Sequence, residues 1–261
     1  MLYPQVIIQP TRDELETAAY IYGRYLTNFT PNTIPLVFVG GFATMLWAGN
    51  VNMFPPPPQC LEILIAAPDM EDLYRPFFTG SEVLLRRTVD GEPIVILYNN
   101  QQQWSGVLVE FIPPGQHGYP FQLVESGIEP NLSLIQCNDV HFPVLRPRFL
   151  LLNRILHLKT LVNETQKLYA LAEIQVLLDC AARELTPDGR GRFSPFEAGV
   201  LVPVVAALLD FAESQGIYVT REHLEIWIVL GIDLRSVNLG TEMGNEQSNW
   251  RRLLRFFAEE Y

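Results

Sequence analysis

A glycine pair between two short apolar segments constrains the fold of this chain more than any other feature. Residues 35–39 form an apolar run, typical of a buried strand, which ends at Gly40 and Gly41. Residues 42–47 then indicate a short helix, and a second apolar run follows at 60–65 after a proline-rich loop. Glycine suits a strand-to-helix turn because such a turn often needs a positive φ and approachable backbone N–H groups. The segment is therefore predicted to fold as strand, turn, helix, loop and strand.

The rest of the first half combines one helix with several strand patterns. Thr11 and Glu14 form a capping box that predicts a helix from about residue 12 to 28. Three further strands are expected, the first two joined by an Asp-Gly turn of the hairpin type, at residues 82–89, 93–98 and 106–112. This half is therefore predicted to be a mixed α/β domain of four or five strands, covering residues 1–143.

The second half changes to segments of helical length. Ser194 and Glu197 form another capping box, with proline at the first helical position. Helices are expected at residues 149–159, 166–185, 195–215, 221–231 and 247–260. The predicted fold class is α/β (α+β): a mixed-sheet domain followed by an all-helical domain at residues 144–261, with the junction near residues 141–143.

Composition limits the partners of the chain. The 261 residues are 48% hydrophobic, which is ample for a core. Only 18 basic residues face 29 acidic ones, giving a net charge of −11. Nucleic acids are bound through Lys and Arg that displace counterions, so no nucleic-acid partner is expected. Arg146, Arg148 and Arg154 are the nearest approach to a basic patch, and a solvated helix surface accounts for them.

Other sequence features indicate a cytoplasmic protein. The three cysteines, Cys60, Cys137 and Cys180, are widely spaced and show no Cys-x-x-Cys metal pattern, which favours reduced thiols. Residues 1–4 lack the basic start of a signal peptide. No apolar run is expected to reach the roughly 20 residues of a membrane-spanning helix, so no membrane partner is predicted.

The order of strand, glycine pair, helix, loop and strand resembles the opening of the nucleotidyltransferase fold. In that family the second strand usually carries two carboxylates at positions i and i+2, which hold Mg²⁺ against a nucleotide triphosphate. A third carboxylate from a neighbouring strand completes the second metal site. Alternate residues of a strand point to the same face, so paired carboxylates there reach one metal. The resemblance covers residues 36–112.

Carried over residue by residue, the resemblance implies a damaged site. Gly40 and Gly41 match the glycine pair, Cys60 and Glu62 match the two strand carboxylates, and Glu110 matches the third. Glu62 and Glu110 are thus the implied catalytic residues, and the other three are ligand-binding positions. A neutral thiol is a poor Mg²⁺ ligand because this ion prefers hard oxygens, so no metal cofactor is expected. If nucleotidyl transfer is retained, Glu62 and Glu110 are the residues that would share one Mg²⁺.

Two tryptophans extend the expected site. Trp47 follows the glycine turn, and Trp104 precedes the third strand of the later group. Aromatic side chains near a cleft are typical of an apolar ligand pocket, so both are predicted to bind ligand. Core packing explains such aromatic residues equally well.

Three function classes remain open on the sequence alone. The first is a degenerate nucleotidyltransferase-like protein that binds a small molecule or a protein partner in the old cleft, without efficient metal-dependent transfer. The second is an enzyme that uses Glu62 or Glu110 for metal-free acid/base chemistry, for example cyclisation or isomerisation, on an apolar metabolite. The third is a weak Mg²⁺-dependent nucleotidyltransferase acting on a small molecule or a protein. The sequence does not set the oligomeric state.

Overall fold

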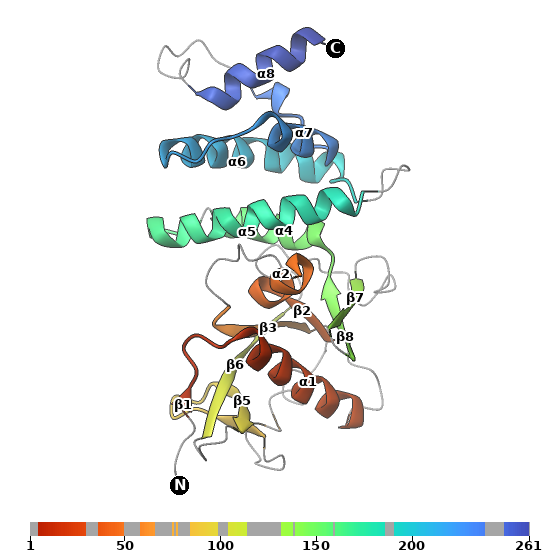
Figure 1. Cartoon of the computed structure of the whole chain (residues 1–261), viewed down its shortest axis with the longest axis vertical. Coiled ribbons are helices and arrows are strands. Elements are labelled where there is room, and N and C mark those ends of the chain that lie inside the picture. Colours follow the sequence, from red (N-terminus) through yellow and green to blue (C-terminus); the bar gives the residue numbers. More distant parts are fainter. Residues whose placement is uncertain are drawn as a thin grey trace. The chain divides into compact units, whose positions relative to one another are not determined.

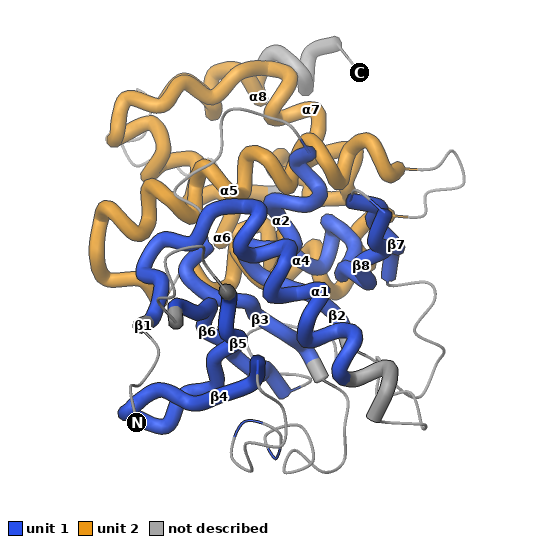
Figure 2. The backbone as a smooth tube through the Cα atoms, turned by 60° about the horizontal axis from the view of Figure 1, so that its bottom comes forward, with its two compact units in different colours: residues 1–150 blue, residues 151–261 orange. Residues whose placement is uncertain are grey.

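The structure is a computed structural model in which the chain divides into two compact units, residues 1–150 and 151–261 (Figure 2). It describes residues 5–29, 36–49, 58–65, 75, 77, 84–98, 104–113, 132–137, 139–158, 160–185, 191–237 and 248–260. Most of the proline-rich loop predicted before the second strand lies outside the described residues. The domain limits predicted from the sequence, 1–143 and 144–261, stay a prediction.

The first unit is built on one mixed sheet of eight described strands (Figure 1). Their order is β4-β5-β6-β3-β2-β8-β7, with β1 beside β6. The β3–β6 and β2–β8 pairs are parallel, whereas the β2–β3, β4–β5, β5–β6 and β7–β8 pairs are antiparallel. The bounds are β1 Gln5–Val6, β2 Leu36–Val39, β3 Cys60–Ile65, β4 Leu85–Arg87, β5 Pro93–Tyr98, β6 Trp104–Ile112, β7 Leu132–Cys137 and β8 Val140–Leu145. The predicted mixed-sheet class is confirmed.

Two helices, α1 (Arg12–Phe29) and α2 (Gly40–Ala48), pack on one face of this sheet. Tyr22 of α1 lies 5.7 Å, ring centre to ring centre, from Phe111 of β6. Phe42 of α2 lies 5.2 Å from Phe38 of β2. Register places Phe38, Ile63 and Phe111 side by side across β2, β3 and β6, so they share this apolar face. Because side chains alternate along a strand, the residues between them point to the opposite face.

The sheet extends beyond the strands that the sequence predicts. Strands β1, β7 and β8 were not expected, and residues 141–143, expected to join two domains, lie within β8. Pro143 is unusual inside a strand because proline cannot donate a hydrogen bond to a ladder. The structure accommodates it because β8 pairs fully with β7, whereas its register with β2 is limited to Phe38 and Val144. Within the predicted strand 82–89, the described residues form only β4, Leu85–Arg87. Residues 82 and 83 lie outside the described part.

Described residues after β8 contain helices and no strand, as predicted. The helices are α4 Pro147–Leu158, α5 Glu164–Arg183, α6 Pro195–Ser214, α7 Arg221–Val229, the short 3-10 helix η2 Leu234–Ser236 and α8 Asn249–Glu260. Helix α5 begins two residues earlier than predicted because the Asn163 side chain accepts hydrogen bonds from the backbone of Thr165 and Gln166. The predicted capping box of Ser194 and Glu197 forms at the start of α6.

Helix α6 corrects one expectation from the sequence. It has 20 residues, and an 18-residue window within it has a mean hydropathy of 1.7, so its length and composition would allow it to cross a membrane. Core helices pass the same test, and this helix buries Leu201, Val205, Leu208 and Leu209 among its neighbours. The expectation that no segment reaches membrane-spanning length is therefore wrong. The predicted absence of a membrane partner and the predicted cytoplasmic location stay predictions.

Candidate functional site

The glycine turn and Glu62 form one structural unit. Strand β2 ends at Val39, which pairs with Glu62 of antiparallel β3, and α2 begins at once with Gly40. The Glu62 carboxylate therefore lies at the N-terminus of α2, where its Oε2 accepts a hydrogen bond from the Gly41 N–H at 2.9 Å. Carboxylates are favoured there because the first N–H groups of a helix lack partners within the helix. The Glu62 carboxylate thus lies at the start of α2, the place where a helix N-terminus binds an anion.

Gly40 has no substitute at this position. Its φ is +61°, in the left-handed region that favours glycine. A Cβ atom built on Gly40 would overlap the carboxylate of Glu62. Glycine is required both by the backbone of the turn and by the close approach of the acidic side chain.

Parallel pairing of β3 with β6 brings the other predicted site residues together. Glu62 pairs with Glu110, and Cys60 pairs with Leu108, so Cys60, Glu62 and Glu110 lie on one face of the sheet. This is the face opposite to the one that α1 and α2 cover. The thiol of Cys60 donates a weak hydrogen bond to Glu110, with 3.9 Å between Sγ and Oε2. Five predicted positions therefore meet at one place, because the turn at Gly40 and Gly41 adjoins this acidic cluster.

Burial, with the acidic cluster beside it, favours the protonated thiol of Cys60 by raising its pKa. Burial raises the pKa of its thiol to about 12, with further upward contributions from the charges of Glu62, Glu110 and Glu92. The thiol is therefore protonated near neutral pH, and a protonated thiol is neither a nucleophile nor a metal ligand. Sequence reasoning missed Glu92, because its position just after the Asp-Gly turn does not indicate that β6 separates β5 from β3 and pairs with both.

These residues do not fit the two-metal site of the nucleotidyltransferases that the sequence resembles. Cys60, at the first strand position, is a neutral thiol. Glu62, at the second, uses one carboxylate oxygen to accept a hydrogen bond from the N-terminus of α2. Among the described residues no group of three or more His, Cys, Asp or Glu side chains is arranged to hold a metal ion. Two-metal chemistry needs both ions to be clamped by oxygen ligands, and this set provides too few of them.

The two predicted tryptophans lie away from the acidic cluster. Trp47 lies in the last turn of α2, roughly 10 Å along the helix from Gly40, and its indole N–H donates to the Leu145 carbonyl at 2.9 Å. Trp104 opens β6 opposite Tyr98, roughly 20 Å along the strand from Glu110. The structure brings neither to the carboxylates. Only the backbone of Trp104 lies in the described part, and the ligand-binding role of both residues stays a prediction.

The bond from Trp47 to β8 gives a test of how α2 is held. Replacing Trp47 with Phe keeps most of the apolar ring but removes the indole N–H, leaving the fully buried Leu145 without that donor. We expect a loss of about 1 kcal/mol in the free energy of unfolding, measured by urea denaturation. An unchanged unfolding midpoint would show that this bond does not hold the helix.

Comparison with known proteins supports the fold. No protein-family model matches the chain, and no curated protein matches it in sequence. Among solved structures the chain is similar to an antigenic nucleotidyltransferase-like protein from Paracoccidioides brasiliensis. The similarity has a TM-score of 0.58 at 14% identity and covers 80% of this chain and 94% of that one. The chain therefore has a nucleotidyltransferase-like fold, with a helical part following the mixed sheet.

Proposed function

We propose that this protein is a degenerate nucleotidyltransferase-like protein that binds a small molecule or a protein partner beside the acidic cluster, without efficient metal-dependent nucleotidyl transfer. The hydrogen bond between the Gly41 N–H and the Glu62 carboxylate is the observation that carries this proposal. A helix N-terminus is a natural site for a phosphate group. Here a carboxylate of the chain itself takes that place.

The length of Glu62 supports this interpretation. Aspartate is the shorter acid, and glutamate adds one methylene, roughly 1.5 Å of reach. With that reach Glu62 spans from β3 to the start of α2, where it acts as a cap. A nucleotide triphosphate would have to displace a group of its own charge from the turn.

The charge of the cluster favours particular ligands. Glu110 and Glu92 are exposed, and Glu62 is partly exposed beside them. Three carboxylates that raise the pKa of one thiol create a negative potential, which repels polyphosphates in the absence of bound cations. The cluster is suited to a neutral or cationic group on a small molecule or on the surface of a partner protein.

Calorimetry with Mg²⁺–ATP tests the proposal, because Cys60→Asp restores the missing carboxylate. We expect weak binding by the wild type and roughly ten- to hundredfold tighter binding by the variant, the range of a charged contact. Cys60→Ser is the matched control, since it replaces the sulfur without adding charge, and it should bind as weakly as the wild type.

Each other outcome has a definite meaning. Tight, Mg²⁺-dependent binding by the wild type would show that Glu62 and Glu110 suffice for a metal, and the degenerate-site proposal would then be wrong. Weak binding by all three proteins would indicate a cleft remodelled for another ligand. In that case Glu62→Gln and Glu110→Gln become the tests for metal-free acid/base chemistry, read out as loss of turnover of candidate apolar metabolites.

A further inference from the structure

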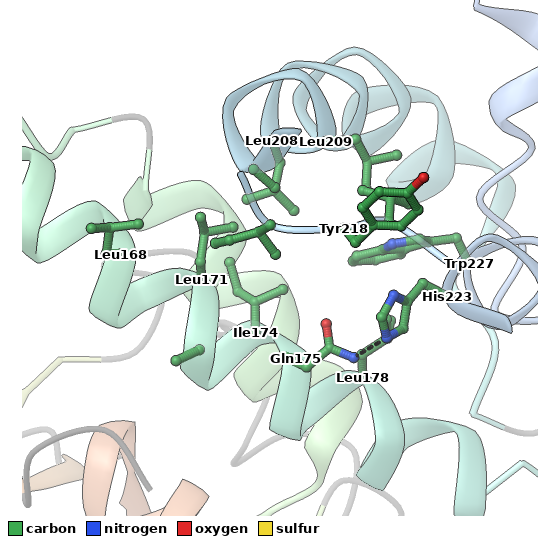
Figure 3. Close-up of a pocket in the computed structure, with 14 residues that line it drawn as sticks. Leu168, Leu171, Ile174, Gln175, Leu178, Leu208, Leu209, Tyr218, His223 and Trp227 are labelled. Carbon is green, nitrogen blue, oxygen red and sulfur yellow. Dashed lines mark hydrogen bonds between the residues drawn. The ribbon is translucent and has the colours of Figure 1, made fainter. Parts of the chain in front are cut away.

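The helical unit contains a cavity that the acidic cluster does not involve. Its volume is about 280 Å³, and Figure 3 shows it between α5, α6, the α6–α7 connection and α7. The deep wall is apolar and buried, and it consists of Leu171, Ile174, Leu178, Leu208, Leu209 and Trp227. Leu168, Ile217 and Tyr218 are exposed at its mouth.

Local sequence explains why this space stays open. Ala172 and Ala212 line the cavity where longer side chains would fill it. Helix α6 ends in a Schellman motif, in which Gly216, with φ +76°, donates to Glu213 and Ile217 donates to Ala212. This reversal leads the chain back across the mouth of the cavity and places the next residues there.

One polar pair interrupts the apolar lining. In the capping box at the start of α7, Nδ1 of His223 accepts a hydrogen bond from the Thr220 N–H at 3.2 Å. The neutral ring therefore carries its proton on Nε2, which lies 2.6 Å from the side-chain amide of Gln175. Because Nε2 of His223 is then the donor, the Gln175 atom that faces it must be an acceptor. That atom is therefore the amide oxygen.

That assignment leaves the NH₂ group of Gln175 as a donor toward the cavity. Figure 3 draws the amide nitrogen of Gln175 toward His223 and the amide oxygen on the side away from it. Exchanging these two amide atoms, as the network requires, puts the NH₂ group on that side. A ligand in this cavity thus meets an apolar wall and one hydrogen-bond donor at its polar end. No charged side chain is among the described residues that line the cavity, so a charged ligand would lose its hydration without gaining a counter-charge.

We infer that this cavity is a binding site for a compact, uncharged, largely apolar molecule that carries one hydrogen-bond-accepting oxygen, such as a ketone, an ether or an alcohol. An apolar cavity of about 150 Å³ holds benzene, so the volume here suits a molecule of roughly ten to twelve non-hydrogen atoms. The apolar wall supplies affinity by burial, and Gln175 selects for the oxygen.

Titration of the isotope-labelled full chain with two matched probes tests this inference by nuclear magnetic resonance. Acetophenone carries a ketone oxygen, and α-methylstyrene replaces that oxygen with a CH₂ group in nearly the same shape. We expect acetophenone to shift the signals of Leu171, Ile174 and Gln175 and to bind roughly three- to tenfold more tightly than α-methylstyrene, the ratio that one neutral hydrogen bond gives. Benzoate, which is charged, should not bind.

Variants on α5 separate the cavity from nonspecific binding. Ala172→Leu fills the space and should weaken both probes at least tenfold, whereas Ala182→Leu, on the same helix but outside the lining, should leave binding unchanged. Gln175→Leu should keep α-methylstyrene binding and abolish the preference for the ketone.

Three results would overturn the inference: no binding of either probe, equal affinity of the wild type for both, or binding that Ala172→Leu leaves intact. If Ala172→Leu does not fold, nuclear Overhauser contacts decide the matter in the wild type. Contacts from the acetophenone methyl group to Leu171 and Ile174 support the site, and contacts elsewhere contradict it.

Discussion

Replacing Gly40 with alanine should destabilise the N-terminal unit by about 2.5–5 kcal/mol. Alanine at a φ of +61° costs about 1–2 kcal/mol. The new methyl group also overlaps the Glu62 carboxylate, so the bond to the Gly41 N–H is lost, at about 1.5–3 kcal/mol for a charged partner. Urea denaturation followed by circular dichroism measures the change.

Two further variants separate the causes. Gly91 also has a positive φ, +92°, but a Cβ atom there meets nothing within 4 Å, so Gly91→Ala should show the backbone cost alone. The double variant Gly40→Ala with Glu62→Ala removes the overlap and should recover part of the loss, giving a coupling energy between the two sites. Equal losses in Gly40→Ala and Gly91→Ala would contradict the close approach of Glu62 to the turn.

Trp250→Ala should cause the largest loss in the helical unit, about 3–5 kcal/mol. Trp250 is fully buried, and its indole N–H donates to Asp210 at 2.8 Å. Its backbone N–H and that of Asn249 both donate to the Glu213 carboxylate, so one α6 side chain caps α8. Removing the ring leaves a cavity, and Asp210 keeps only its hydrogen bond from Arg251 among the described residues. Thermal unfolding measures the loss.

Trp250→Phe serves as the control for this prediction. It keeps an aromatic ring in the core but removes the donor to Asp210, and we expect about 1–2 kcal/mol, clearly less than for alanine. If alanine and phenylalanine have equal effects, the hydrogen bond rather than the packing of the ring holds α8 in place.

Local patterns predicted most elements of this fold. Strands β2, β3 and β5 form at the residues where apolar runs indicate them, and the capping box at Thr11 starts α1, with Glu14 accepting from the Thr11 backbone at 2.7 Å. Strands β7 and β8 were missed because Pro143 and the polar residues of β7 weaken the strand pattern of these segments. They form strands because they pair with each other and with the sheet, which local sequence does not show.

The arrangement of the site was less accessible to sequence reasoning. A strand pattern places Cys60 and Glu62 on one face, but it does not show that β6 pairs in parallel with β3 and puts Glu110 opposite Glu62. The hydrogen bond from Gly41 to Glu62 depends on the register of β2 with β3, which the pattern of neither strand sets. The cavity near Gln175 depends on the packing of three helices, and no local pattern encodes such packing.

The bond between Glu62 and the start of α2 also bears on competition at the turn. An acceptor tethered within the same chain acts at an effective concentration of about millimolar or more. A free anion reaches the Gly41 N–H only when it exceeds that threshold or brings contacts elsewhere. We therefore expect the turn to keep one conformation while the surrounding nucleotide or phosphate stays below that concentration.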